Sequence, residues 1–375
     1  MSSNILLINP EISNSSQNQK IKAVTYAAFP SSLAVLVSCL EKEGITGVQV
    51  EDDQIKPISD HDLEQCVNQL NAPKIIGMSV LTLNSGRAYE LAEKIKQIDP
   101  ETTVVLGGIH PTVVPEECLR KKGVDVVVRG EGELTFIEFV QKVLGNEDYT
   151  GIKGISYIKN AEPVHNPDRE LIVDLDEIPP MPYHLFEKDL EKYSSFATVV
   201  GTRGCPYQCT FCSSRSISGK RYRYHSVERI VSECEILIRK YKQTAIHFLD
   251  DNMAVKKKRF FQMCDAIIEK GLHKEAFFHG SMRGDNATTE VLQKAKQANF
   301  KIIYYGMETG IERLMKIVDK GETVQDVVDA IKRGHDVGLE IGTTIIFGLP
   351  TETRKDRYDT MKLIRKRSFL SVRYY

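Results

Sequence analysis

Three cysteines lie within one short stretch, GTRGCPYQCTFCSS, at positions 201–214. Cys205, Cys209 and Cys212 have the spacing Cys-x3-Cys-x2-Cys. Thiolates are soft ligands that suit iron–sulfur clusters, and a 4Fe-4S cluster ordinarily takes four of them. Three cysteines would leave one iron open to an exogenous ligand, much as a catalytic zinc site keeps one position free of protein.

Two other uses of this spacing fit less well. A structural zinc site needs four ligands, and the next candidate, His225, stands thirteen residues beyond Cys212. A redox pair of Cys209 and Cys212 would leave Cys205 without a role. The remaining cysteines lie in helical apolar patterns, where a free thiol is usually a small buried hydrophobe: Cys39, Cys66, Cys118, Cys234 and Cys264.

The stretch CPYQCTFC resembles the cluster motif of the radical S-adenosylmethionine (SAM) enzymes, including the aromatic residue before the third cysteine. The preceding RGCP is typical of the cobalamin-dependent branch of that family. The resemblance implies a 4Fe-4S cluster whose open iron chelates SAM, and a 5′-deoxyadenosyl radical that takes hydrogen from a substrate. It makes the three cysteines the catalytic and metal-binding residues and places Phe211 beside the adenine.

Two later segments resemble further stations of that family. HFLDDNM would bring Asp250 and Asp251 to the cofactor or substrate, although Asp251 or Asn252 would also suit as a helix cap. HGSMRGD would present Arg283 to the SAM carboxylate, because a guanidinium fork can bind both oxygens.

Two more stations follow along the chain. YYGMETG would offer Glu308 to the ribose of SAM. GTTIIFGLPTET resembles the family's G-x-I-x-G-x-x-E element, in which Ile346 and Gly348 would let the backbone approach the adenine. Ordinary exposed charges remain an alternative for both Arg283 and Glu308.

Two motifs in the first half of the chain follow apolar runs. SVL and GG, together with GGIHPTVVPEE and VVRGEGELTF, resemble the cobalamin-binding domain that precedes the radical SAM barrel in many family members. The resemblance assigns Ser79, Leu81, Gly107 and Gly108 to the corrin or its nucleotide tail, with His110 near the tail or its dimethylbenzimidazole. Plain βα turns of a flavodoxin-like domain would also be rich in glycine.

One feature of methionine-synthase-type cobalamin domains is missing. Their cobalt ligand is the histidine of D-x-H-x-x-G after the first strand, and the corresponding NPEISNSSQNQKIKAVTYAAFPSS contains no histidine. Cobalt would then lack that lower ligand and stay free to accept and give a methyl group. A domain that had lost cobalamin would show the same absence.

The elements that must position these residues alternate between strands and helices. Strands are predicted at 4–9, 47–52, 74–80, 102–107 and 124–128, and helices at 31–43, 60–71, 85–98, 115–122 and 132–144. The alternation predicts an α/β fold whose first domain, residues 1–147, is flavodoxin-like (Rossmann-type) with a five-stranded parallel sheet. Residues 148–193 predict a β-hairpin and a proline-rich connector.

A second alternating series occupies residues 194–375. Strands are predicted at 196–201, 244–249, 275–280, 301–306 and 340–347, with a sixth at SFLSVRYY, and helices at 226–242, 256–270, 289–298, 323–337 and 356–367. This series predicts a partial (β/α)6 TIM-like barrel, in which ligands gather at the C-terminal ends of the strands. Family barrels continue into a substrate-covering segment, so we expect the chain to be truncated at its C-terminus.

The composition is that of a globular protein. The chain has 375 residues, 41% of them hydrophobic and 27% charged, with a formal net charge of −1. This balance gives no argument for nucleic acid as a partner. The N-terminal MSSNILLINP is too weakly apolar for a signal peptide or a membrane span, so we expect a cytoplasmic protein. Eight cysteines in such a chain argue against a disulfide scaffold.

Three functions fit these features. The first is a radical enzyme that uses a 4Fe-4S cluster, SAM and cobalamin to transfer a methyl group to an unactivated carbon or phosphorus. A radical cyclase or oxidative enzyme on a tetrapyrrole-like substrate fits the same motifs, and a non-catalytic cobalamin- or cluster-binding sensor is the third. The expected partners are a small-molecule or peptide substrate and an electron donor such as flavodoxin or ferredoxin.

Overall fold

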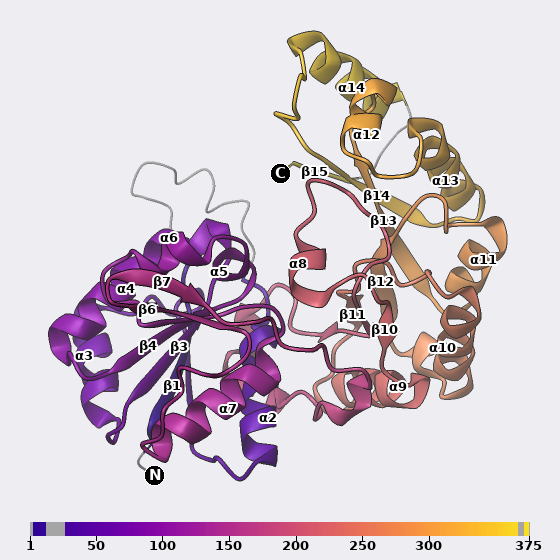
Figure 1. Ribbon diagram of the computed structural model, residues 1–375. Coiled ribbons are helices and arrows are strands. Elements are labelled where there is room, and N and C mark those ends of the chain that lie inside the picture. The colour runs from indigo at the N-terminus through magenta and orange to yellow at the C-terminus, as the bar shows by residue number, and fades with distance from the viewer. Residues whose placement is uncertain (1–2, 13–26, 367–370, 375) are drawn as a thin grey trace. The chain divides into compact units, whose positions relative to one another are not determined.

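The computed structural model describes residues 3–12, 27–366 and 371–374, and the chain forms two compact units (Figure 1). Unit 1 comprises Met1–Val173, Glu177–Phe196 and Ser216–Ser218. Unit 2 comprises Asp174–Asp176, Ala197–Arg215 and Gly219–Tyr375. The predicted hairpin and nearly all of the predicted connector lie in unit 1. No helix within the described residues is both long and apolar enough to cross a membrane.

Unit 1 is built on a seven-stranded sheet with the order β2-β1-β3-β4-β5-β6-β7. Its first five strands are parallel and agree with the predicted strands: β1 (Ile5–Asn9), β2 (Gln49–Asp52), β3 (Ile75–Ser79), β4 (Thr103–Gly107) and β5 (Val126–Val128). Their order, 2-1-3-4-5, is that of flavodoxin-like folds. The residues of β1, β3, β4 and β5 are mostly buried, because helices cover the sheet on both faces.

The helices of unit 1 build one hydrophobic core on each face of the sheet. They are α2 (Ser31–Lys42), α3 (Asp60–Gln69), α4 (Ser85–Ile98), α5 (Ile109–Val113), α6 (Pro115–Leu119) and α7 (Gly132–Leu144). Because successive strand residues point to opposite faces, Leu6 packs with the residues of α3 and α4, and Leu7 with those of α2 and α7. Carboxyl ends of the parallel strands therefore meet at one edge, from which the predicted site loops emerge.

The predicted five-stranded sheet is extended by the hairpin that the sequence placed in the connecting segment. β6 (Ile155–Lys159) pairs antiparallel with β5, and β7 (Glu162–His165) pairs antiparallel with β6. The first three residues of β6 are buried, since they join the core beside β5. The sheet is thus mixed, with five parallel strands and two antiparallel ones.

The proline-bearing connector contributes a second attachment to unit 1. Its 3-10 segment η3 (Tyr183–Lys192) follows Pro182. The rings of Tyr183 and Phe186 lie 5.4 and 5.0 Å from that of Phe29, centroid to centroid. This aromatic cluster fixes a stretch in which the prolines prevent a regular helix or central strand.

Unit 2 has a six-stranded, wholly parallel sheet with the order β15-β14-β13-β12-β11-β8. The strands are β8 (Thr198–Val199), β11 (Ala245–Phe248), β12 (Phe277–Met282), β13 (Phe300–Glu308), β14 (Glu340–Ile345) and β15 (Ser371–Tyr374). Within the described residues, the two end strands of this sheet, β8 and β15, each pair with only one other strand of the sheet. The sheet is therefore open, as a partial (β/α)6 barrel requires. The predicted sixth strand is β15, although positions 367–370 and 375 lie outside the described residues.

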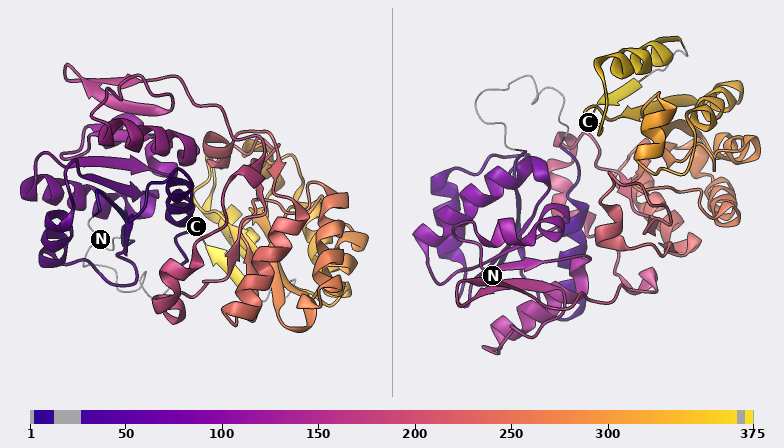
Figure 2. Two further views of the ribbon diagram at one scale, coloured as in Figure 1. Left: turned by 90° about the horizontal axis from the view of Figure 1, so that it is seen from below. Right: turned by 45° about the horizontal axis from the view of Figure 1, so that its top comes forward.

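Long helices pack along the sheet of unit 2 (Figure 2). They match the predicted ones: α9 (Val227–Glu235) with its π-helical extension η4 (Ile236–Lys240), α10 (Lys257–Glu269), α11 (Thr289–Gln297), α13 (Val324–Asp336) and α14 (Arg354–Lys366). Phe260 of α10 packs on Phe300 of β13, with 5.8 Å between ring centroids.

The sequence did not predict several short elements of this half of the chain. They are α8 (Ser214–Ser218), η5 (Leu272–Lys274), α12 (Glu312–Ile317) and the ribbon of β9 (Thr202–Arg203) with β10 (Arg223–Tyr224). Each is too short to display a hydrophobic period.

Candidate active site

The three cysteines lie on the loop that follows β9 in unit 2. Gly204 opens this loop with a φ of +82°. The backbone N–H of Cys205 donates to the carbonyl of Gly219 over 3.3 Å, and that of Thr210 donates to the carbonyl of Val318 over 2.9 Å. Two distant segments therefore hold the loop.

The three thiols are free and are not joined in disulfides. Cys205 and Cys209 are half-buried, Cys212 is exposed, and none of the three forms a disulfide. Burial raises the pKa of each thiol, and at Cys209 the charges of Lys320 and Arg283 oppose that rise in pKa. Cationic side chains near a thiol favour the thiolate that a metal cluster needs.

No group of three His, Cys, Asp or Glu side chains among the described residues converges closely enough to hold a single metal ion. A 4Fe-4S cluster does not require such convergence, because each of its cysteine ligands binds a different iron atom. Three uncombined thiols on one loop are therefore compatible with a cluster and do not form a ready site for a lone ion.

The structure gives little support to a structural zinc site that uses His225 as its fourth ligand. The imidazole of His225 is buried, and its Nδ1 donates to Oδ1 of Asp176 over 3.1 Å. Burial lowers the pKa of His225 to about 4. The five other cysteines all lie on helices: Cys39, Cys118, Cys234 and Cys264 are buried and Cys66 is half-buried.

Aromatic side chains flank the cysteines on the loop. Phe211, predicted to border the adenine of SAM, is exposed. The ring of Tyr207 lies 3.6 Å from the guanidinium carbon of Arg283, and its hydroxyl donates to Oδ1 of Asn286 over 3.1 Å. Tyr207 thus ties the cluster loop to the end of β12.

The two aspartates after β11 have different surroundings. Asp250 is buried and accepts a hydrogen bond from the backbone of Gly201 over 3.2 Å. Burial raises the pKa of Asp250 to about 6, against the opposing effects of Thr202 and Arg259. Asp251 is exposed and accepts a hydrogen bond from the Ser214 hydroxyl. Asp250 therefore braces the strand that leads to the cluster loop, while Asp251 can meet a ligand.

Arg283 is already engaged by its own unit. Its Nε and Nη2 donate to the two carboxylate oxygens of Asp285 over 3.1 and 2.9 Å, and its Nη1 donates to the carbonyl of Lys320 over 2.7 Å. A SAM carboxylate could take the fork of Arg283 only by displacing Asp285. In this structure the Arg283 guanidinium, which the sequence analysis assigned to the SAM carboxylate, links the loop after β12 to the loop that contains Lys320.

Glu308 and Ile346 meet where β13 and β14 end. The N–H of Ile346 donates to the carbonyl of Glu308 over 2.9 Å. Glu308 is buried with a φ of +57°, and its Oε1 accepts from the ammonium of Lys320 over 3.0 Å. Gly348 is exposed with a φ of +83°, and its N–H donates to Glu352 over 2.7 Å.

Lys320 and Glu322 belong to this site, and the sequence reasoning missed them. Both are buried, and their charged groups lie 3.1 Å apart. A lysine and a glutamate in a loop normally indicate a solvated surface, so the sequence pattern gave no reason to place them inside. The only local signal is the glycine between them, Gly321, whose φ is +73°.

The predicted cobalamin residues lie at the carboxyl ends of β3 and β4 in unit 1. Gly108 has a φ of +98°, and a Cβ on it would stand 2.9 Å from the carbonyl oxygen of Val80. A Cβ on Gly107 would meet nothing closer than 3.8 Å. The hydroxyl of Ser79 lies 2.9 Å from that of Ser32. Close approach of two loops therefore requires glycine at 108 and not at 107.

His110 is buried between two hydroxyl groups. Its Nδ1 lies 3.2 Å from Oγ1 of Thr82, and its Nε2 lies 2.8 Å from the hydroxyl of Tyr89. Burial lowers the pKa of His110. Both ring nitrogens are engaged, so the imidazole supports the loop after β3 and is not open to a metal.

Exposed apolar side chains occur on the segments that follow β3, β4 and β5. Leu81 and Leu83 follow β3, Val113 ends α5, and Leu134 lies in the first turn of α7. The carboxyl ends of parallel strands share one edge of a sheet, so these segments emerge at the edge where such folds bind ligands. Exposed apolar side chains on them would suit the apolar face of a large cofactor such as a corrin. Much of the stretch that lacks the cobalt-binding histidine, residues 13–26, lies outside the described residues.

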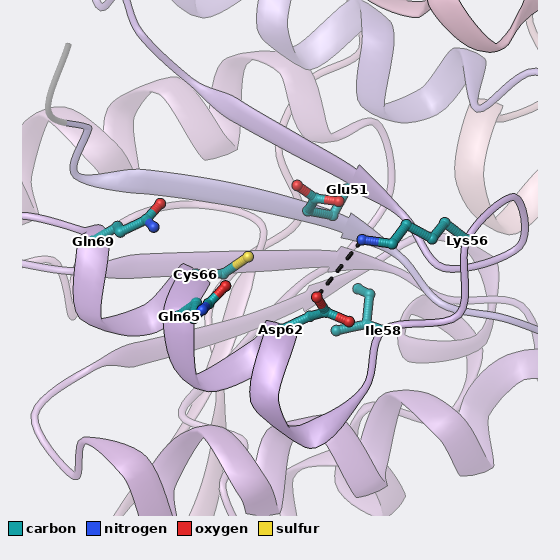
Figure 3. A pocket seen from close by; sticks show the side chains of 7 residues that line it. All are labelled: Glu51, Lys56, Ile58, Asp62, Gln65, Cys66 and Gln69. Carbon is teal, nitrogen blue, oxygen red and sulfur yellow. Dashed lines mark ion pairs between the residues drawn. The ribbon is translucent and has the colours of Figure 1, made fainter.

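A separate small pocket opens beside β2 and α3 (Figure 3). It has a volume of about 180 Å³, and Lys56 and Asp62 form an ion pair of 3.6 Å in its wall. Its lining consists of Glu51, Lys56, Ile58, Asp62, Gln65, Cys66 and Gln69. None of the predicted site residues is among them.

Comparison with known families divides the chain in the same way. Residues 199–364 match the model of the radical SAM superfamily, and residues 21–140 match the B12 binding domain. An uncharacterized methyltransferase of Pyrococcus horikoshii is 35% identical over 340 residues, which cover 90% of this chain and 73% of that protein. An anaerobic magnesium-protoporphyrin IX monomethyl ester cyclase of Rubrivivax gelatinosus is 26% identical over 352 residues, which cover 90% of this chain and 62% of the cyclase.

A solved structure has a similar fold. It is the radical SAM methyltransferase TsrM from Kitasatospora setae with cobalamin and a 4Fe-4S cluster bound. It superposes with a TM-score of 0.81 at 18% identity and covers 100% of this chain and 75% of that one.

Proposed function

Because the chain belongs to the cobalamin-dependent radical SAM family, we propose that it is a methyltransferase that acts on an unactivated carbon or phosphorus. One observation carries the proposal. Cys205, Cys209 and Cys212 are uncombined thiols on a loop beyond strand β8 of an open parallel barrel, in a chain that also has a B12 binding domain.

In this proposal the side chains of unit 2 divide the work. The cluster would supply the electron that cleaves SAM to a 5′-deoxyadenosyl radical, and cobalamin would supply a transferable methyl group. The three cysteines hold the cluster. The exposed carboxylate of Asp251 and the buried carboxylate of Glu308 meet SAM. Arg283 and Asp250 orient the surrounding loops, because their polar groups are bound to the chain itself.

Unit 1 would bind cobalamin over its apolar edge. Leu81, Leu83 and Val113 would cover one face of the corrin and exclude water from it. Ser79 would hydrogen-bond the buried tail. We infer further that a small molecule or peptide is the substrate and that a one-electron carrier such as flavodoxin or ferredoxin reduces the cluster.

The similarity to a cyclase supports a second candidate, a radical cyclase on a tetrapyrrole-like substrate. A cyclase would leave the methyl group of SAM out of its product. Incubation of the loaded protein with SAM carrying a deuterated methyl group, in candidate extracts, separates the two. Label in a new product favours methyl transfer, and a product without label favours cyclisation.

The enzyme proposal is tested by anaerobic reconstitution with iron and sulfide, followed by dithionite and SAM. We expect 5′-deoxyadenosine to form, and Cys209→Ala to abolish both the cluster absorbance and that product. The matched control is Cys264→Ala, which removes a buried thiol on α10. An intact cluster without 5′-deoxyadenosine would contradict the enzyme and leave a binding protein or sensor.

A further inference from the structure

Residues 318–322, with the sequence VDKGE, form a tight loop after α12 that we name the clasp. Left-handed backbone at Asp319 (φ +48°) and Gly321 (φ +73°) makes the turn. The carbonyl of Val318 accepts the N–H of Thr210 from the cluster loop over 2.9 Å. The clasp is therefore in direct contact with the segment that carries the cysteines.

The ammonium group of Lys320 is the centre of the clasp. Its Nζ donates to Oε1 of Glu308 over 3.0 Å and to the carbonyl of Gly306, and it lies 3.1 Å from Oε1 of Glu322. All three side chains, those of Lys320, Glu308 and Glu322, are buried. Two of the three oxygens around this ammonium accept hydrogen bonds from it, and the oxygen of Glu322 forms an ion pair with it.

A line of alternating charges runs from the clasp to the end of β12. The guanidinium of Arg283 lies 3.6 Å from Glu322 and donates to Asp285 and to the Lys320 carbonyl. Including Glu308, the line has three acidic and two basic groups, and each basic group stands between two acids. Removing the Lys320 ammonium would leave the buried carboxylate of Glu308 without its cation and Glu322 with Arg283 alone, an arrangement that carries a large cost.

The backbone of Glu308 is also under constraint. Its φ of +57° is unfavourable for a residue with a side chain, and the pairing of β13 with β14 shifts register between Gly306 and Glu308. Strained backbone persists only where the surroundings determine it. Lys320 helps to hold this backbone in place, because its ammonium donates hydrogen bonds to both the Glu308 carboxylate and the Gly306 carbonyl.

We propose that Lys320 is a positioning residue for SAM: it holds the Glu308 carboxylate in place and aimed at the cofactor. This inference rests on the proposed function, in which Glu308 meets SAM. It assigns Lys320 no contact with the cofactor. Its predicted effect therefore passes entirely through Glu308.

A double-mutant cycle tests this dependence. SAM affinity is measured by equilibrium dialysis on the anaerobically reconstituted full chain, for the wild type, Glu308→Gln, Lys320→Met and the double variant. Loss of a hydrogen bond to a charged group should weaken binding on the order of tenfold to hundredfold in each single variant. The double variant should bind no more weakly than Glu308→Gln alone, since the two residues act as one unit.

The control is Lys316→Met, which removes an exposed lysine of α12 and should leave SAM affinity unchanged. Bound iron is measured in every variant. If Lys320→Met loses iron, Lys320→Met/Glu322→Gln takes its place, because it also removes one of the two buried carboxylates that the ammonium had paired with. Loss of iron in both would assign Lys320 a structural role alone and overturn the proposal.

Two other results would overturn it. Penalties that multiply in the double variant would show that Lys320 acts independently of Glu308, and normal affinity in Glu308→Gln would remove the group it is said to position. A wild-type chain that holds its cluster and binds no SAM would contradict the proposed function itself, and this inference with it. That result is distinguishable because it appears before any substitution is made.

Discussion

At the scale of single residues, Gly108 illustrates how one atom decides whether two loops can meet. A methyl group there would press on the Val80 carbonyl and strain a backbone at φ +98°. We expect Gly108→Ala to lower the free energy of unfolding by about 1–3 kcal/mol, and Gly107→Ala to change it by less than about 1 kcal/mol. Urea unfolding followed by circular dichroism measures both, and equal effects would contradict the argument.

Asp250 gives a pH dependence with a definite sign. Burial raises the pKa of its carboxyl from 3.8 to about 6 in the folded chain, so between these values the folded state binds more protons than the unfolded state. Stability from this group therefore falls as the pH rises through that window. In Asp250→Asn, which can still accept from Gly201, this part of the slope should vanish.

The measurement for Asp250 is urea unfolding of the metal-free chain at several pH values from about 4 to 7. Asp265→Asn, which changes an exposed carboxylate on α10, serves as the control and should keep the wild-type slope. A slope that survives in Asp250→Asn would show that another group is responsible for it.

At the scale of elements, the hairpin β6–β7 belongs to the core of unit 1 and is not merely a link. Ile155 is 0% exposed and Ile158, on the same strand, is 38% exposed. We expect Ile155→Ala to cost about 2–5 kcal/mol of unfolding free energy, because it leaves a cavity in the core. Ile158→Ala should cost less than about 1 kcal/mol in the same urea experiment. A loss below about 1 kcal/mol from Ile155→Ala as well would mean that the hairpin is not part of the folded core.

The elements also show what a sequence can and cannot predict. Periodic apolar patterns located the five parallel strands of unit 1 and the long helices of unit 2, because burial of one face imposes that period. The pairing of β6 with β5 was missed, since partners across a sheet leave no mark in a local window. The contacts of Lys320 with Glu308 and Gly306 were missed for the same reason, since these residues are 12 and 14 positions away in the chain. The contact of Arg283 with Asp285 is local, and the sequence reasoning missed it because it assigned the Arg283 guanidinium to SAM.

At the scale of the whole molecule, each unit has its own sheet, and the candidate residues divide cleanly between them. The three cysteines lie in unit 2, whereas Ser79, Leu81, Gly108 and the rest of the cobalamin set lie in unit 1. Loss of a cluster ligand should therefore not disturb the core of unit 1, which supports the proposed cobalamin residues at the ends of β3 and β4. The two cofactor sites should load independently.

Cys209→Ala tests this independence in the full chain. After anaerobic reconstitution and incubation with hydroxocobalamin, this variant should lack the cluster's iron and form no 5′-deoxyadenosine. Its bound corrin should match the wild type within about twofold in affinity, because no cobalamin residue in unit 1 has been altered. Absorbance spectra of the desalted protein measure both cofactors at once. If cobalamin is lost together with the cluster, the corrin depends on the cluster-bearing unit, and the assignment of its site to unit 1 alone is wrong.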